Sequence, residues 1–325
     1  MSCRQISRRD FSRRVLLGTA AALSLEDRHL LAKPTEPAAA AKPAKPAPLG
    51  TLPTGKIGDL ELSRLIMGGN LIGGFAHSRD LMYVSPLLKH YFTPEKVLET
   101  LELAEQHGIN CVNTNPGGAQ LIQRYWKERG GKIKWMVQGN PNAADNFASL
   151  KALVDAGADT IYIQGNEGDK LSRDGNADLL GKAFEFIKAN GLPAGIAGHE
   201  LRTPMFVEKA GLAPDYYVKT LHGTDYWSTR RPGQDKDIVD NYSVDNYWCK
   251  DPDEVTKYMA GVKRPWIAYK VMAAGAIKPR AAFKYAFEHG ADFILAGIFD
   301  FQVAEDAQIA REVLAKVNRA RPWMA

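Results

Sequence analysis

The sequence predicts an α/β fold, a (β/α)8 TIM barrel, over residues 55–325. Short apolar runs alternate with amphipathic segments in this region, giving eight strand–helix units. Such alternation predicts parallel strands covered by helices, and eight units in roughly 270 residues suit a closed barrel. An open doubly wound sheet is the alternative. No Gly-x-Gly-x-x-Gly motif leads from the first strand into a helix, which disfavours that alternative.

The elements follow one another in a regular order. The first apolar run, "RLIMGGN", precedes a helix in which Pro94 lies near the first turn and Gly108 closes the end. Apolar runs predict strands at 64–70, 110–114, 133–139, 159–165, 193–199, 215–223, 264–275 and 292–300. Amphipathic segments predict helices at 93–108, 119–131, 142–158, 177–191, 203–211, 251–262, 278–291 and 304–317.

Residues 1–32 resemble a twin-arginine export signal. Arg8 and Arg9 are adjacent, Phe11 follows two positions later, and an apolar run extends from Val15 to Leu25. This run is too short to be a permanent membrane span. We therefore expect transient contact with the twin-arginine export machinery, no stable membrane insertion, and a periplasmic or extracellular location. A disordered basic N-terminus is the alternative.

Residues 33–54 predict a disordered spacer, because Pro, Ala and Lys dominate them and few apolar residues are available for burial. The formal charge of the chain is +5, and residues 1–50 account for it with nine Lys/Arg and four Asp/Glu. The remainder has 33 basic and 33 acidic residues and is neutral. A nucleic-acid-binding domain would carry excess positive charge, so nucleic acid is not expected as a partner.

In a TIM barrel the functional residues follow the C-terminal ends of the strands. Amides are abundant at these positions: Asn70, Asn113, Asn115, Gln138, Asn140, Gln164 and Asn166. Amides donate and accept hydrogen bonds without charge, which suits a small polyhydroxy, sugar-like substrate. The alternative is that they cap helices and close turns. We expect Asn70, His77, Arg79, Asn113, Asn115 and Gln164 to bind the substrate.

Two histidines, His199 and His222, end consecutive strands, so both are candidate catalytic residues. Neighbouring strands lie about 4.8 Å apart, and Glu167 follows the strand before them. Imidazole and carboxylate groups around a divalent ion would activate water or polarise a carbonyl. The sequence therefore predicts a divalent metal such as Zn or Mn, held by Glu167, His199, His222 and Cys249. The alternative is that these histidines are hydrogen-bonded structural residues.

Two further candidate catalytic residues are Lys270 and Asp300. Lys270 follows an apolar run in the seventh strand and could form a Schiff base, or it could pair with Asp300 after the eighth strand. Lys219 lies in the sixth strand, where alternation places it on the face opposite to His222.

The longest irregular segment runs from Gly223 to Cys249 and is rich in aromatic residues, including Trp227. A long loop in a compact domain is usually functional, so Trp227 is a candidate substrate-binding residue. Cys249 could bring a thiolate to the histidine pair or pack beneath the following helix. Cys111 lies in an apolar run and is predicted to be a small buried hydrophobic residue. The three cysteines of the chain imply no disulfide framework.

The motifs "GDLELSRLIMGG", "LETLELAEQHGINCVNT", "DTIYIQG", "AGIAGH" and "ADFILAGIFD" together resemble the aldo/keto reductase-like barrels, NAD(P)-linked oxidoreductases, over most of the chain. The segments "GGNLIGG", "HSRDL", "KTLH", "NYWC" and "KVMAAGAI" resemble an exported bacterial branch of this superfamily. The resemblance to this branch implies no particular reaction.

Reductases of this superfamily use an Asp, Tyr, Lys and His tetrad. By resemblance, the corresponding positions are Asn113, Gly118, Gln138 and Asn166, and Gly118 leaves room where the Tyr would stand. The segment "AGIFDFQVAED" occupies the region that binds the cofactor phosphate and lacks a Lys/Arg/Ser cluster, so NADP is not expected.

The leading hypothesis from the sequence is an exported metal-assisted lyase, isomerase or hydrolase for a polyhydroxy substrate. A divergent NADP-dependent oxidoreductase and a non-catalytic ligand-binding protein of the cell envelope are the alternatives.

Overall fold

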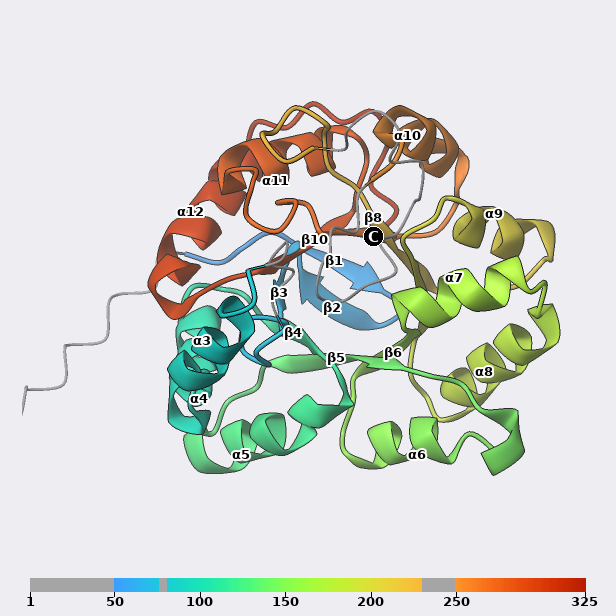
Figure 1. Ribbon diagram of the computed structural model, residues 1–325, viewed down its shortest axis with the longest axis horizontal. Helices are drawn as coiled ribbons and strands as arrows, with labels where there is room; N and C mark the ends of the chain where they lie inside the picture. The colour runs from blue at the N-terminus through green and yellow to red at the C-terminus, as the bar shows by residue number, and fades with distance from the viewer. Residues whose placement is uncertain (1–49, 76–80, 230–248) are drawn as a thin grey trace, which may run out of the picture. The chain divides into compact units, whose positions relative to one another are not determined.

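The computed structural model describes residues 50–75, 81–229 and 249–325. Eight parallel strands close into a barrel in the order β10-β3-β4-β5-β6-β7-β8-β9 (Figure 1). They are β3 (Leu65–Gly68), β4 (Cys111–Thr114), β5 (Lys134–Gly139), β6 (Thr160–Ile163), β7 (Ala194–Gly198), β8 (Tyr216–Thr220), β9 (Trp266–Tyr269) and β10 (Phe293–Gly297). The predicted (β/α)8 barrel is confirmed.

Helices surround the barrel (Figure 1) and lie close to the predicted ranges. They are α4 (Pro94–Gln106), α5 (Ala119–Arg129), α6 (Ala148–Asp155), α8 (Ala177–Ala189), α9 (Arg202–Lys209), α10 (Pro252–Gly261), α11 (Pro279–Glu288) and α12 (Val303–Leu314). Pro94 lies in the first turn of α4, as predicted. Thr93 caps this helix by accepting a hydrogen bond from the Lys96 amide at 3.3 Å.

Two helices that the sequence analysis did not predict lie in connections on the C-terminal side of the strands. They are α3 (Val84–Tyr91), in the segment after β3, and α7 (Gly165–Arg173), directly after β6. The sequence of α7, "GNEGDKLSR", contains two glycines and only one large apolar residue, so its helical signal is weak. The Gln164 side chain caps it by accepting from the Glu167 amide at 3.1 Å.

The β-strands alternate their side chains between two apolar layers. Ile66, Met136 and Val218 belong to a cluster inside the barrel, whereas Met67 and Tyr217 pack between the barrel and its helices. Cys111 is fully buried in the interior layer, which confirms its prediction as a small buried hydrophobic residue. Burial on both faces explains why these strands appear as nearly continuous apolar runs in the sequence.

An antiparallel hairpin of β1 (Thr54–Ile57) and β2 (Leu60–Ser63) precedes the barrel. Ile57 and Leu62 are fully buried and pack with the interior residues of the barrel, so the hairpin plugs one end. Leu52 is also buried and Thr54 begins β1. The folded part therefore starts slightly before residue 55, the boundary predicted from composition.

The carboxylate of Asp292, immediately before β10, organises the C-terminal tail. It is fully buried and accepts hydrogen bonds from the Trp266 amide at 3.1 Å and the Met324 amide at 2.9 Å. Arg319 and Arg321 approach it at 3.3 and 3.5 Å. The three contacts from Arg319, Arg321 and Met324 fasten the tail to the start of β10, and the Trp266 amide joins Asp292 to β9.

Several predicted features lie outside the described residues. These are the signal peptide (1–32), most of the spacer (33–54), the substrate-binding candidates His77 and Arg79, and residues 230–248 of the long loop. Export and its route stay predictions from the sequence. Along the described chain, no helix combines the length and hydropathy needed to cross a bilayer.

Replacing Asp292 by Ala is expected to destabilise the fold by about 3–5 kcal/mol, because it leaves Arg319 and Arg321 without their buried carboxylate. Urea unfolding measures this loss. Asp178→Ala breaks only an exposed pair with Lys182 and is expected to cost less than about 1 kcal/mol. Equal midpoints for the two variants would contradict the role assigned to Asp292.

Candidate functional site

A cavity of about 1550 Å³ opens where the C-terminal ends of the strands meet, and we call it the mouth cavity. All seven amides predicted for this rim line it: Asn70, Asn113, Asn115, Gln138, Asn140, Gln164 and Asn166. Apolar side chains such as Leu71, Met272 and Phe299 complete the walls. Polar groups set in a largely apolar concave surface are typical of a small-molecule site.

Asp169 and His199 form a hydrogen-bonded pair at this rim. Asp169 is fully buried in α7 and accepts the Nδ1–H of His199 at 2.8 Å and its backbone amide at 2.9 Å. The Glu200 amide at 3.1 Å and the Thr203 hydroxyl at 2.7 Å complete four hydrogen bonds. Because Nδ1 donates to the carboxylate, Nε2 is the ring nitrogen left as an acceptor.

Helix α7 brings Asp169 to this position, and Gly165 allows the approach. A Cβ on Gly165 would lie 2.6 Å from Cε1 of His199 and 2.7 Å from the Tyr269 hydroxyl. A larger residue would therefore displace both groups. The first residue of α7, the His199 ring and the Tyr269 hydroxyl thus meet at one point of the mouth cavity.

Tyr269 and Lys270 come from the end of β9. Tyr269 is the last residue of the strand, and its ring lies 5.3 Å from the His199 ring, centroid to centroid. Lys270 has a positive φ of 59°, and its Nζ lies 5.7 Å from the centre of the Tyr269 ring. A non-glycine residue in this backbone region is strained, and such strain is common at functional sites. The predicted strand to residue 275 ends at Tyr269, because the chain turns at Lys270.

Burial changes the protonation of these groups. Burial lowers the pKa of His199 to about 4, although Asp169 opposes the shift. Burial alone would raise the pKa of Asp169, but the hydrogen bonds from His199 and Thr203 outweigh it and leave the pKa below its usual range. Burial lowers the pKa of Lys270 well below its ordinary value. The site therefore favours a neutral imidazole next to an ionised carboxylate, and it shifts the protonation equilibrium of Lys270 towards the amine.

Solved structures match this chain, whereas no protein-family model and no curated protein sequence does. Two structures assigned to an aldo-keto reductase from Pseudomonas aeruginosa have TM-scores of 0.55 and 0.56 at 17% identity. They cover 81% and 83% of this chain, and this chain covers 94% and 99% of theirs. The fold is that of an aldo-keto reductase-like TIM barrel.

A truncated 3-deoxy-D-arabino-heptulosonate 7-phosphate synthase from Thermotoga maritima matches at a TM-score of 0.48 and 13% identity. This match covers 82% of this chain and 96% of the synthase. At 17% identity the two aldo-keto reductase structures show the fold alone, and the reaction of this barrel has to be argued from its own residues.

The structure shows the surroundings of two positions, Asn113 and Gly118, that the sequence analysis matched to the reductase tetrad by resemblance. Asn113 exchanges hydrogen bonds with the Tyr162 hydroxyl at 3.0 and 3.2 Å inside the barrel. Gly118 does not leave room for a side chain, contrary to the expectation from the sequence. A Cβ there would lie 2.6 Å from the Thr114 hydroxyl, because η1 (Pro116–Gly118) folds back onto the end of β4.

The region that follows β10 carries several carboxylates. Asp300 lies in η3 (Asp300–Gln302), directly before α12, and Glu305 and Asp306 occupy the first turn of that helix. Carboxylates near a helix start occupy the positive end of its dipole and repel another anion. The expectation that NADP does not bind stays a prediction from the sequence.

The four predicted metal ligands are not gathered. His222 donates Nδ1–H to the Gly223 carbonyl at 2.9 Å and accepts the Cys249 amide at Nε2 at 2.9 Å, so both ring nitrogens have backbone partners. His199 Nδ1 is held by Asp169, and Glu167 is absent from the mouth-cavity wall. No group of three or more His, Cys, Asp or Glu side chains in the described chain could hold a metal ion. A divalent metal remains a prediction from the sequence alone.

Two interpretations of single residues need correction. Asp300 accepts from the Tyr91 hydroxyl at 2.7 Å and pairs with Lys96 at 3.3 Å, so Lys270 is not its partner. Cys249 contacts His222 through its amide, while its thiol points to the Thr220 carbonyl at 3.6 Å. Packing in the core, the alternative interpretation for Cys249, is the one observed.

Most other predicted site residues line the mouth cavity, namely Asn70, Asn113, Asn115, Gln164, His199, His222, Trp227 and Lys270. The sequence analysis missed Asp169 and Tyr269. Asp169 lies in the unrecognised helix α7, and Tyr269 was hidden within an apolar strand. The available signal was the polar cluster "NEGD" directly after a strand end, where barrel chemistry is expected.

His199 is expected to make the stability of the fold depend on pH. Its folded pKa of about 4 lies below the unfolded value of about 6.5, so the unfolded chain binds more protons between these values. The free energy of unfolding should therefore fall by about 3 kcal/mol as the pH drops from 6.5 to 4. Urea unfolding at stepped pH values should show a shallower fall for His199→Gln. Parallel curves for the two proteins would argue against the buried neutral imidazole.

Proposed function

We propose that this chain is an enzyme that forms a Schiff base with the carbonyl of a small polyhydroxy compound and then moves protons on it. The reaction classes are isomerase or lyase. The observation that carries the proposal is Lys270, whose pKa is lowered by burial, lining the same cavity as a neutral His199 held by Asp169. The amide-lined mouth cavity supplies hydrogen bonds for hydroxyl groups.

The roles follow from the geometry. The Lys270 amine adds to the substrate carbonyl, and loss of water leaves an iminium ion that withdraws electrons from the neighbouring carbon. Nε2 of His199 accepts a proton from that carbon or from a nearby hydroxyl, and Asp169 stabilises the imidazolium that forms. The Tyr269 hydroxyl, beside the His199 ring, is placed to donate a proton to the departing water.

A panel of three- to six-carbon aldoses, ketoses and keto acids tests this function. Incubation with sodium borohydride should convert the imine to a secondary amine and add the mass of the reduced substrate to Lys270. Lys270→Met should lose the adduct, whereas Lys278→Met removes another lysine of the same cavity and should retain it. An adduct that survives Lys270→Met would refute the assignment of Lys270.

Proton transfer by His199 is tested separately. Exchange of the hydrogen beside the carbonyl for deuterium, followed by NMR, should slow by about 10²–10⁴-fold in His199→Asn. The borohydride adduct on Lys270 should persist in this variant, because the imine forms without the imidazole. Unchanged exchange would exclude His199 as the base.

A divergent nicotinamide oxidoreductase is the second candidate. Asp169, His199, Tyr269 and Lys270 include the four residue types of the reductase tetrad, gathered around other strand ends. A fluorescence titration with NADPH separates the candidates. We expect no saturable binding, because carboxylates occupy the start of α12. Micromolar binding that weakens in Lys278→Gln would favour the oxidoreductase.

Two further properties inferred from the sequence, export and a divalent metal, belong to this proposal, and a non-catalytic protein is the remaining alternative. We propose export by the twin-arginine route, supported by Arg8 and Arg9 ahead of an apolar run. Metal analysis of protein purified without chelators tests the divalent metal. A non-catalytic envelope protein would be stabilised by members of the same panel without turning them over.

A further inference from the structure

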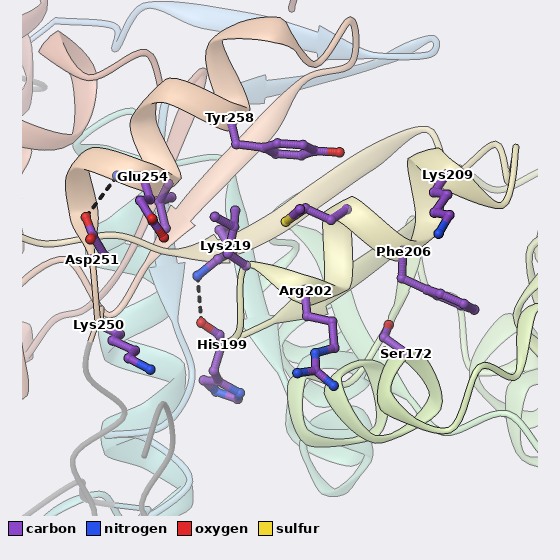
Figure 2. Close-up of a pocket in the computed structure, with 13 residues that line it drawn as sticks. Ser172, His199, Arg202, Phe206, Lys209, Lys219, Lys250, Asp251, Glu254 and Tyr258 are labelled. Carbon is purple, nitrogen blue, oxygen red and sulfur yellow. Dashed lines mark hydrogen bonds between the residues drawn. The ribbon is translucent and has the colours of Figure 1, made fainter. Parts of the chain in front are cut away.

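A second cavity, of about 1100 Å³, lies on the outside of the barrel, and we call it the outer cavity. Its walls come from α7, α9, the segment that starts α10, and β8 (Figure 2). Lys219 of β8 reaches it because its side chain points away from the barrel interior, the opposite direction to Val218. The outer cavity is thus separate from the rim at which the proposed chemistry occurs.

One residue stands between the two cavities. His199 lines both, with its carbonyl on the outer side, where it accepts from Lys219 Nζ at 2.6 Å (Figure 2). Its ring lies on the mouth side against Tyr269. The prediction that Lys219 and His222 face opposite sides holds, because Lys219 lines the outer cavity and His222 lines the mouth cavity.

The side chains of the outer cavity combine basic and apolar character. Four basic residues line it: Arg202, Lys209, Lys219 and Lys250. Of the two carboxylates, Asp251 already caps α10 by accepting the Glu254 amide at 2.9 Å. The apolar walls are Leu201, Met205, Phe206, Val255 and Tyr258. This combination suits an organic anion. The apolar part of such a ligand would pack on the apolar walls, and its anionic group would lie near the basic side chains.

Ser172 provides an independent indication of a ligand. Its side chain lines the outer cavity from α7 and is only 4% exposed. Its hydroxyl has no hydrogen-bond partner among the residues that the structure describes. Buried hydroxyl groups are nearly always bonded, and each exception calls for an explanation. A ligand oxygen in this cavity would supply the bond.

We propose that the outer cavity binds a small organic anion, with its charged group between Arg202 and Lys209 and an oxygen bonded to Ser172. The site is distinct from the proposed catalytic site and does not depend on the reaction there.

The dye 8-anilino-1-naphthalenesulfonate, an aromatic sulfonate, is the probe for a fluorescence titration of the intact chain. Arg202→Gln with Lys209→Gln should raise its Kd at least about tenfold. The matched control, Lys182→Gln with Arg280→Gln, removes the same charge from exposed ion pairs elsewhere and should change Kd less than about twofold. Equal Kd values in the two double variants would overturn the proposal.

Two single variants locate the dye. Ser172→Ala should weaken binding without lowering the melting temperature of the unliganded protein, because the hydroxyl has no partner among the described residues. A lowered melting temperature would assign the hydroxyl to the fold and overturn its ligand role. Lys278→Gln alters the mouth cavity and should leave binding unchanged. Loss of binding there would place the dye in the mouth cavity and refute the outer site.

Discussion

Closure of the barrel through the parallel pairing of β10 with β3 is the constraint on which the other features depend. Closure removes free sheet edges and brings all eight C-terminal strand ends to one rim. Residues as distant in sequence as Asn70 and Lys270 therefore line one cavity. At the other end, the β1–β2 hairpin closes the barrel, and Asp292 holds the C-terminal tail.

At the rim, Asp169 sets the electrostatics of the candidate site. Its four hydrogen bonds join α7 to the segment between β7 and α9, and they fix the orientation of His199. Burial lowers the pKa values of His199 and Lys270, while Asp169 stays ionised because donors surround it. Groups whose pKa values are moved in this way are typical of acid–base and nucleophilic sites.

His199 also relates the two cavities, since Lys219 holds its carbonyl from the outer side. An anion bound near Arg202 would lie behind the residue whose ring faces the mouth cavity. His199 therefore contributes to the walls of both cavities.

The sequence by itself determined the barrel and the row of amides that lines the mouth cavity, and it predicted the C-terminal rim as the candidate site. These follow from local periodicity and from the rule that chemistry lies at strand ends. Only the tertiary structure decided the partners: Asp169 for His199, Lys96 for Asp300, and backbone groups for His222. Those pairings depend on the backbone conformation of the segment that follows each strand. Weak local signals, such as the glycine-containing α7 and the bend at Lys270, do not specify these turns.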